Sequence, residues 1–150
     1  MTNQKDNLAV QAIRFPENPI IHAGLDEQIG HNINGVTHDG QRSFLATSHD
    51  GLRFHAMSEV LGPWYFRTFQ HEAAWFAIAK ATDTHGGGVL LRSSDAIQPF
   101  EQGPDILPNQ RHVAVLKRGS ALYIFFSRGK DCPERILVSK MSLKGDWEKW

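Results

Sequence analysis

The sequence predicts an all-β protein that consists of repeated four-stranded antiparallel units. Its apolar runs are short, rich in β-branched and aromatic residues, and separated by turns that contain Gly, Pro or Asp. No segment keeps the 3.6-residue apolar period that indicates a helix. Strand, turn and proline positions also recur at intervals of 45 to 48 residues. This interval matches the length of a β-propeller blade, roughly 40–50 residues.

Residues 1–40 are predicted to form an N-terminal segment and a loop. The stretch from Asp26 to Asn34 has neither a helical nor a strand period and is dense in polar side chains. Two of its asparagines, Asn32 and Asn34, are candidates for ligand contact. The alternative explanation is a series of Asx-type turns, in which an asparagine side chain bonds nearby backbone.

Residues 41–63 are predicted to form a partial unit. Residues 43–47 are typical of a strand, and residues 48–51 of a turn that contains Asp and Gly. A second strand is predicted at residues 52–54. The Leu-Gly-Pro sequence at residues 61–63 is predicted to end the unit.

Residues 64–108 are predicted to form one complete unit. Two strands, at residues 65–69 and 74–79, flank a short turn, and a glycine-rich loop at residues 82–88 leads to a strand at residues 89–92. The glycines do not indicate a phosphate-binding loop, because no Lys-Ser/Thr pair and no helical pattern follow them.

Residues 109–150 are predicted to form a unit that lacks its end. Residues 111–127 indicate a hairpin whose two apolar strands meet at a glycine-containing turn at residues 118–120. A third strand is predicted near residues 136–138. Residues 147–150 are predicted to begin a fourth.

An internal repeat relates these units. The Ser-x-Asp turn at Asp50 recurs 45 residues later at Asp95, a proline recurs with the same step, and Trp75 is matched to Tyr123 48 residues on. Chance similarity between hairpins is the alternative. The aspartates are predicted to stabilise their turns by accepting backbone N–H groups. Because even the smallest propellers have about four blades, the chain is too short to close one.

The composition excludes several classes of partner. Lys and Arg number 16, as do Asp and Glu, so electrostatics does not favour binding to nucleic acid or to a membrane surface. Cys132 is the single cysteine and can form no internal disulfide. The polar start of the chain shows no apolar signal segment, and no run approaches the ~20 apolar residues of a membrane span. We therefore expect a cytoplasmic protein.

Four blocks of the sequence resemble a known family. They are NPIIHAGLDEQIGHNING, VLGPWYFRTFQHEAAWFAIA, ILPNQRHVAVLKRG and FSRGKDCPERILVS. Together they resemble the five-bladed β-propeller proteins of the glycoside hydrolase type, of the arabinanase and β-xylosidase group. The resemblance extends over most of residues 14–150 and implies two to three blades of such a propeller. The resemblance is incomplete. Such proteins carry further chain between the positions that match Gly35 and Gln41, and a further blade after the position that matches Trp150. This sequence has no counterpart to either.

The resemblance implies that the protein binds or hydrolyses an oligosaccharide. Glycosidases generally use two carboxylates that flank the scissile bond. The family places its acidic residues on the innermost strands, but the matching positions here are not carboxylates. They are Asn32, Asn34, Arg67, Arg111 and His112. The alternatives are a non-catalytic carbohydrate-binding or interaction module, or a truncated product without independent activity.

The predicted topology gathers the candidate site at one end of the strands. In each unit the first strand and the connection between the second and third strands meet at that end, where loops converge around a concave surface. The predicted substrate-binding residues are Asn32, Asn34, Tyr65, Arg67, Arg111, His112, Arg128 and Arg135.

Glu134 is the candidate catalytic residue, because it is the carboxylate whose predicted position best fits this end of the strands. The alternative is a surface ion pair with Arg135. No metal motif is present among the eight histidines, although a cation on the axis near His112 is a candidate cofactor. Open strand edges predict a homo-oligomer that pairs them.

Overall fold

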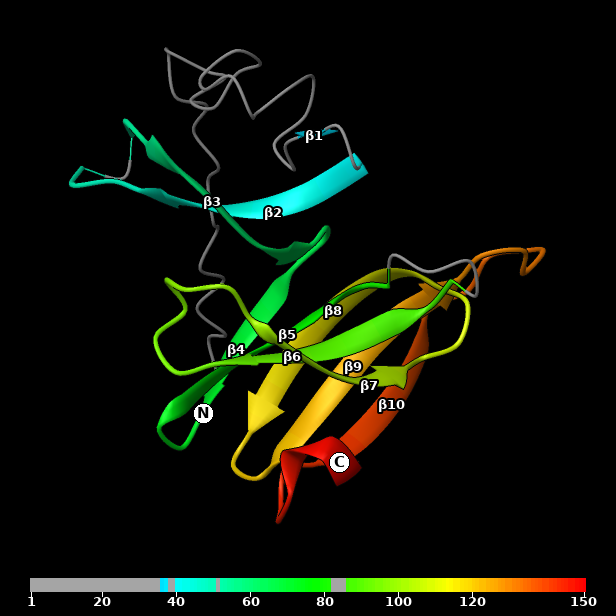
Figure 1. Ribbon diagram of the computed structural model, residues 1–150. Coiled ribbons are helices and arrows are strands. Elements are labelled where there is room, and N and C mark those ends of the chain that lie inside the picture. The colour runs from blue at the N-terminus through cyan, green and yellow to red at the C-terminus, as the bar shows by residue number, and fades with distance from the viewer. Residues whose placement is uncertain (1–35, 38–39, 51, 82–85) are drawn as a thin grey trace, which may run out of the picture.

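The computed structural model describes residues 36–37, 40–50, 52–81 and 86–150, and it confirms the all-β prediction. Within these residues, ten strands form three antiparallel sheets, and one short 3-10 helix lies near the C-terminus (Figure 1). The strands are β1 (Val36–Thr37), β2 (Gly40–Thr47), β3 (His55–Pro63), β4 (Arg67–His71), β5 (Ala74–Lys80), β6 (Gly88–Ser93), β7 (Glu101–Ile106), β8 (Gln110–Arg118), β9 (Ala121–Arg128) and β10 (Leu137–Ser142). None of these sheets closes on itself.

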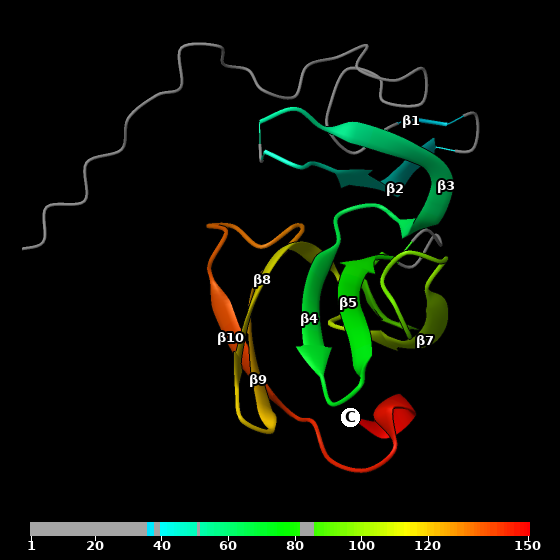
Figure 2. The same cartoon turned by 90° about the vertical axis from the view of Figure 1, so that its left-hand side faces the viewer.

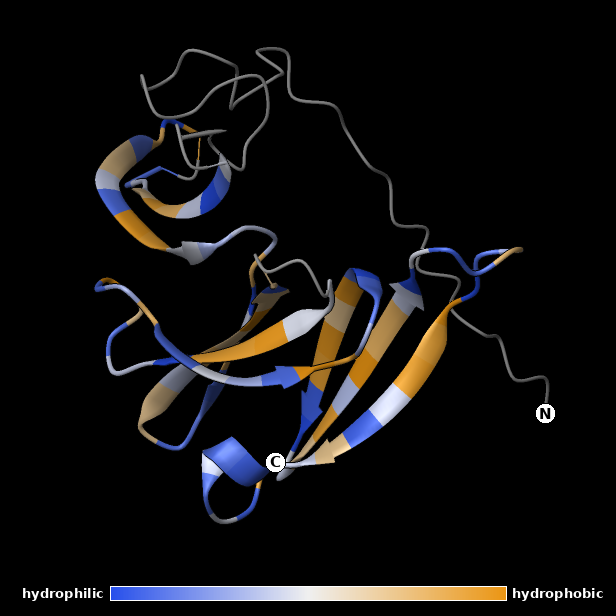
Figure 3. Cartoon of the chain, turned by 45° about the vertical axis from the view of Figure 1, so that its right-hand side comes forward, coloured by the Kyte–Doolittle hydropathy of each residue, from blue (hydrophilic) through white to orange (hydrophobic). Residues whose placement is uncertain are grey.

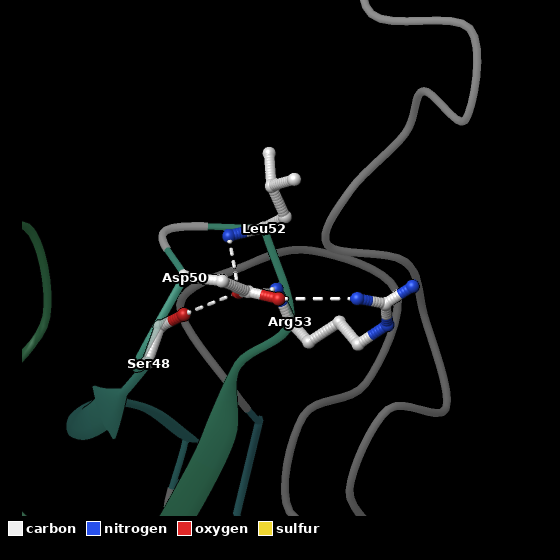
Figure 4. Close-up of polar contacts among 4 residues, drawn as sticks. All are labelled: Ser48, Asp50, Leu52 and Arg53. Carbon is white, nitrogen blue, oxygen red and sulfur yellow. Dashed lines mark hydrogen bonds and ion pairs between the residues drawn. The ribbon is translucent and has the colours of Figure 1, made fainter.

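The first sheet has the order β1-β2-β3 and is built on the β2–β3 hairpin. The prediction of a strand at residues 52–54 is wrong, because the second strand runs from His55 to Pro63. The turn occupies these residues instead. The Asp50 carboxylate accepts the backbone N–H groups of Leu52 and Arg53, both at 2.8 Å, which bends the chain where a strand was expected (Figure 4).

The two Ser-x-Asp turns have the same geometry, as the repeat predicts. Asp95 accepts the N–H groups of Ile97 and Gln98 at 2.9 and 3.0 Å, in the same two positions that Asp50 bonds. In each turn the serine two residues earlier donates its hydroxyl to the aspartate, at 3.0 Å in the first and 3.2 Å in the second. The structural role predicted for these aspartates is confirmed.

The Asp95 turn is expected to lose stability in acid. Hydrogen bonds from the backbone of Gln98 and then Ile97 hold the pKa of Asp95 below its usual value of 3.8. The stabilisation is therefore complete above the pKa of the unfolded chain and is lost as the pH falls below about 4, through the lower folded pKa. The free energy of unfolding, measured by circular dichroism at a series of acid pH values, should fall less steeply with decreasing pH for Asp95→Asn than for the wild type. An equal pH dependence of the two proteins would contradict the stabilising role of the Asp95 carboxylate.

The second sheet is an antiparallel meander in the order β4-β5-β6-β7. The predicted strands at residues 65–69, 74–79 and 89–92 are present, with the first beginning two residues later, at Arg67. Strands β5 and β6 are buried on both faces, which explains why their sequences are nearly continuous apolar runs rather than alternating ones.

The third sheet contains the predicted hairpin as β8 and β9, with β10 beside β9. Its two faces differ. Val113, Leu122 and Ile124 are buried on the inner face. The outer face exposes Phe125 and Val138, which are directly paired across β9 and β10. The hydropathy colouring shows apolar positions along all three strands (Figure 3).

The second and third sheets stack through one hydrophobic cluster (Figure 2). Phe69, Phe76, Ile78 and Leu90 from the second sheet pack with the inner face of the third. The opposite face of the second sheet packs with β3 through a separate cluster that includes Leu61 and Ala77. The second sheet is therefore covered on both sides.

The prediction that residues 147–150 begin a fourth strand is wrong. Trp147–Lys149 form a 3-10 helix whose N-cap, Asp146, accepts the N–H of Glu148 at 3.2 Å. The helix lies against β7, and the rings of Trp147 and Trp150 contact the Phe76 ring at centroid distances of 6.0 and 4.8 Å. The aromatic residues that suggested a strand thus cover one end of the core that joins the two sheets.

Candidate functional site

Five side chains come together where β4 and β8 begin and where β9 ends. We call this group the polar cluster. It consists of Tyr65, Arg67, Arg111, His112 and Glu134. Four of these were predicted substrate-binding residues and the fifth was the predicted catalytic residue, so the structure brings the described core of the predicted site together. Asn32 and Asn34 lie outside the described residues.

Tyr65 and His112 link the two sheets directly. Tyr65 Oη and His112 Nδ1 are hydrogen-bonded at 2.6 Å. Tyr65 precedes β4 with a φ of 72°, a left-handed conformation that is uncommon for a residue with a bulky side chain. Strained backbone of this kind is often held at functional sites. The bond to Nδ1 orients the imidazole and leaves Nε2 as the ring nitrogen available to a ligand.

Arg67 is engaged by backbone and aromatic groups. Its Nε donates to the carbonyl of Val113 at 3.1 Å and its Nη1 to the carbonyl of Phe66 at 2.9 Å. The guanidinium carbon lies 4.6 Å from the centroid of the Tyr65 ring. Arg67 thereby ties the start of β4 to β8 and fixes the tyrosine that positions His112.

Glu134 accepts two hydrogen bonds, one on each carboxylate oxygen. Arg111 Nη1 lies 2.9 Å from Oε2, and the Ser127 hydroxyl donates to Oε1 at 2.5 Å. The β8–β9 register shifts between Gln110 and His112, so Arg111 lies at a β-bulge or a similar irregularity of the strand. The ion pair predicted with Arg135 is instead made with Arg111.

Of the remaining predicted arginines, Arg128 is the last residue of β9 and Arg135 lies in the segment that follows. Arg128 Nε pairs at 3.2 Å with Oδ2 of Asp131, which lies in that segment. Arg135 is exposed and lines a pocket of about 510 Å³ beside the polar cluster. At the polar end of the pocket, His112 is paired with Ser127 across β8 and β9, and Ser127 is bonded to Glu134; Arg135 also lines the pocket. Its apolar wall includes Phe125 and Ile136.

Sequence reasoning missed Ser127 and Gln110. Ser127 is buried at the end of an apolar strand, and nothing in its sequence neighbourhood marks it as a partner of Glu134. Gln110 is fully buried at the start of β8, and neither atom of its side-chain amide has a hydrogen-bond partner among the described residues. Its backbone carbonyl accepts a bond from Lys80 Nζ, and burial lowers the pKa of that lysine.

Across the ranges that the structure describes, no three His, Cys, Asp or Glu side chains gather in a group that could hold a metal ion. In the same ranges, no helix has the length and apolar character needed to cross a membrane.

Part of the chain is similar to a viral protein. An uncharacterized protein of Acanthamoeba polyphaga mimivirus is 32% identical over 125 residues, a match that covers 72% of this chain. The chain spans 33% of the length of that relative. No family model and no solved structure matches the chain.

Proposed function

We propose that the protein is a glycoside hydrolase-like propeller protein that binds an oligosaccharide at the polar cluster and the adjoining pocket. The observation that carries the proposal is the pocket itself, which combines hydrogen-bonding side chains with exposed apolar side chains in one lining. Sugars present hydroxyls at the ring edge and C–H groups on the ring face, and the two parts of the pocket match these two surfaces.

The stacked sheets support the propeller part of the proposal. The second sheet is a four-stranded antiparallel meander, and its neighbour repeats the first three strands of that pattern. Such sheets, arranged one against the next, are the blades of a propeller. A cytoplasmic location is part of the proposal and is supported by Cys132, which is exposed and free.

Binding is better supported than hydrolysis. Glu134 is the one carboxylate that lines the pocket among the described residues, and both of its oxygens already accept hydrogen bonds. A glycosidase needs a second carboxylate, about 5–10 Å from the first. Among the described residues, no second carboxylate lines the pocket.

Removing two side chains of the polar cluster is expected to abolish oligosaccharide binding. The double variant Arg111→Ala, His112→Ala loses the charged partner of Glu134 and the imidazole at the polar end of the pocket. We expect at least about a tenfold loss of affinity, since each hydrogen bond involving a charged group contributes about 1.5–3 kcal/mol. Glycan-array binding followed by calorimetry on the best ligand would measure it.

The matched control is Lys117→Ala, Arg118→Ala, which removes two cationic side chains from the opposite end of β8. It should retain wild-type affinity. The absence of glycan binding by folded wild-type protein, or equal binding by both double variants, would overturn the proposal.

A second candidate function is assembly through strand edges. Strand β10 pairs with β9 on one side, and its other edge has no strand partner among the described residues. Open edges favour pairing with another strand. We infer that the protein forms homo-oligomers through such an edge, and a monomer by light scattering across a concentration series would contradict this.

A further inference from the structure

The polar cluster and its adjoining segment concentrate positive charge in a chain of zero net charge. The segment from Ser127 to Ile136 together with Arg67 and Arg111 carries five cationic side chains and two carboxylates. The cations are Arg67, Arg111, Arg128, Lys130 and Arg135. A surplus of one sign around a pocket raises the local concentration of ligands of the opposite sign.

Most of these charges already have partners. Arg111 is paired with Glu134 and Arg128 with Asp131, and Arg67 donates to two backbone carbonyls. Arg135 differs, because it lines the pocket and has no ion pair with any carboxylate that the structure describes. Arg67 and Lys130 also lack an ion pair with a described carboxylate, but of these three cations Arg135 is the one that lines the pocket.

The pocket also restricts the shape of that ligand. Arg135 and His112 both line the pocket, and His112 is oriented by its bond to Tyr65. Phe125 and Ile136, 40% and 82% exposed, supply an apolar surface next to them. A ligand that fills the pocket carries an anionic group at one end and an apolar face on its ring. The volume of about 510 Å³ lies within the usual range for small-molecule sites.

We propose that the oligosaccharide is acidic, with a uronic acid residue whose carboxylate binds Arg135 and the Nε2 of His112. A guanidinium matches a carboxylate geometrically through two parallel N–H donors, and an imidazole N–H supplies a third. The sugar ring lies with its C–H face on Phe125 and Ile136. This inference rests on the proposed carbohydrate-binding function and specifies the substrate class for the same site.

Matched ligands test the charge requirement. Calorimetry would compare a trigalacturonate with its carboxyl-reduced neutral counterpart and with a sulfated galactose trisaccharide. We expect the wild type to bind the trigalacturonate at least about tenfold more tightly than the neutral trisaccharide. Arg135→Gln should remove most of this ratio while leaving the neutral ligand unaffected, and Arg118→Gln, at the far end of β8, should leave the ratio unchanged.

The outcomes separate this inference from the proposed function. Equal binding of the acidic and the neutral trisaccharide would overturn the acidic specificity and leave carbohydrate binding in place. Tighter binding of the sulfated ligand would overturn the assignment to a carboxylate. If glycan-array screening of the folded wild type detects no ligand, acidic or neutral, the proposed function fails, and this inference fails with it.

Discussion

Leu122→Ala is expected to lower the free energy of unfolding by about 2–5 kcal/mol, as large-to-small substitutions at fully buried leucines do. Leu122 is 0% exposed and lies in the cluster that joins the second and third sheets. Its neighbours come from different sheets, among them Ile78 on β5 and Val113 on β8. Because both sheets would have to move to fill the cavity, it should stay largely open, which favours a cost in the upper part of that range.

The matched control is Leu116→Ala. Leu116 lies on β8, next to the strand of Leu122, but it belongs to the outer face and is 43% exposed. The same substitution there removes an apolar side chain that is already partly in water, and we expect a cost below about 1 kcal/mol. Urea denaturation monitored by tryptophan fluorescence would compare the two variants. Similar costs at both positions would show that the two sheets do not share a core.

Gly103→Ala is expected to destabilise the protein by about 1–3 kcal/mol, the usual cost of overpacking. A Cβ atom at Gly103 on β7 would overlap the outer carbons of the Trp147 ring and lie 3.1 Å from the carbonyl oxygen of Leu90. The ring cannot shift outward without loosening the 3-10 helix, whose other tryptophan, Trp150, packs on Phe76. The methyl group therefore displaces the C-terminal turn from the core.

Two comparisons isolate the cause. Gly129→Ala places its new methyl near a single atom, the carbonyl oxygen of Asn109, at 3.9 Å, and should cost much less. Combining Gly103→Ala with Trp147→Ala removes the overlap, so the double variant should be more stable than the sum of the two single effects predicts. Strict additivity, measured by thermal unfolding, would show that Trp147 does not pack over Gly103.

The sequence is a good guide to elements whose cause is local. The hairpin of β8 and β9 is predicted because two strand-forming runs meet at a glycine turn, and Gly119 indeed has a left-handed φ of 57°. The turns at Asp50 and Asp95 are predicted because an aspartate bonds amides two and three residues later. These interactions lie within a few residues of one another.

The alignment of repeats fails where a single residue matters. Trp75 was matched to Tyr123, but Trp75 packs in the cluster that faces β3. Tyr123 lies on the outer face of the third sheet, where it is paired with the exposed Leu116 on β8 and with Lys140 on β10. Strand side chains alternate between faces, so a one-residue slip moves a residue to the other side of the sheet. Similarity of residue type cannot detect that slip, whereas hydrogen-bond register does.

The sequence by itself determined the all-β class, the main hairpins and the gathering of Tyr65, Arg111, His112 and Glu134 at one end of the strands. Only the tertiary structure decided what each of these side chains does. It pairs Glu134 with Arg111, next to the register shift between Gln110 and His112, and with Ser127, rather than with its chain neighbour Arg135. A strand pattern indicates which end of a sheet a residue occupies. The bonding partners of Glu134 lie 7 and 23 residues away in the sequence, and which residues they are depends on register and on how the sheets stack.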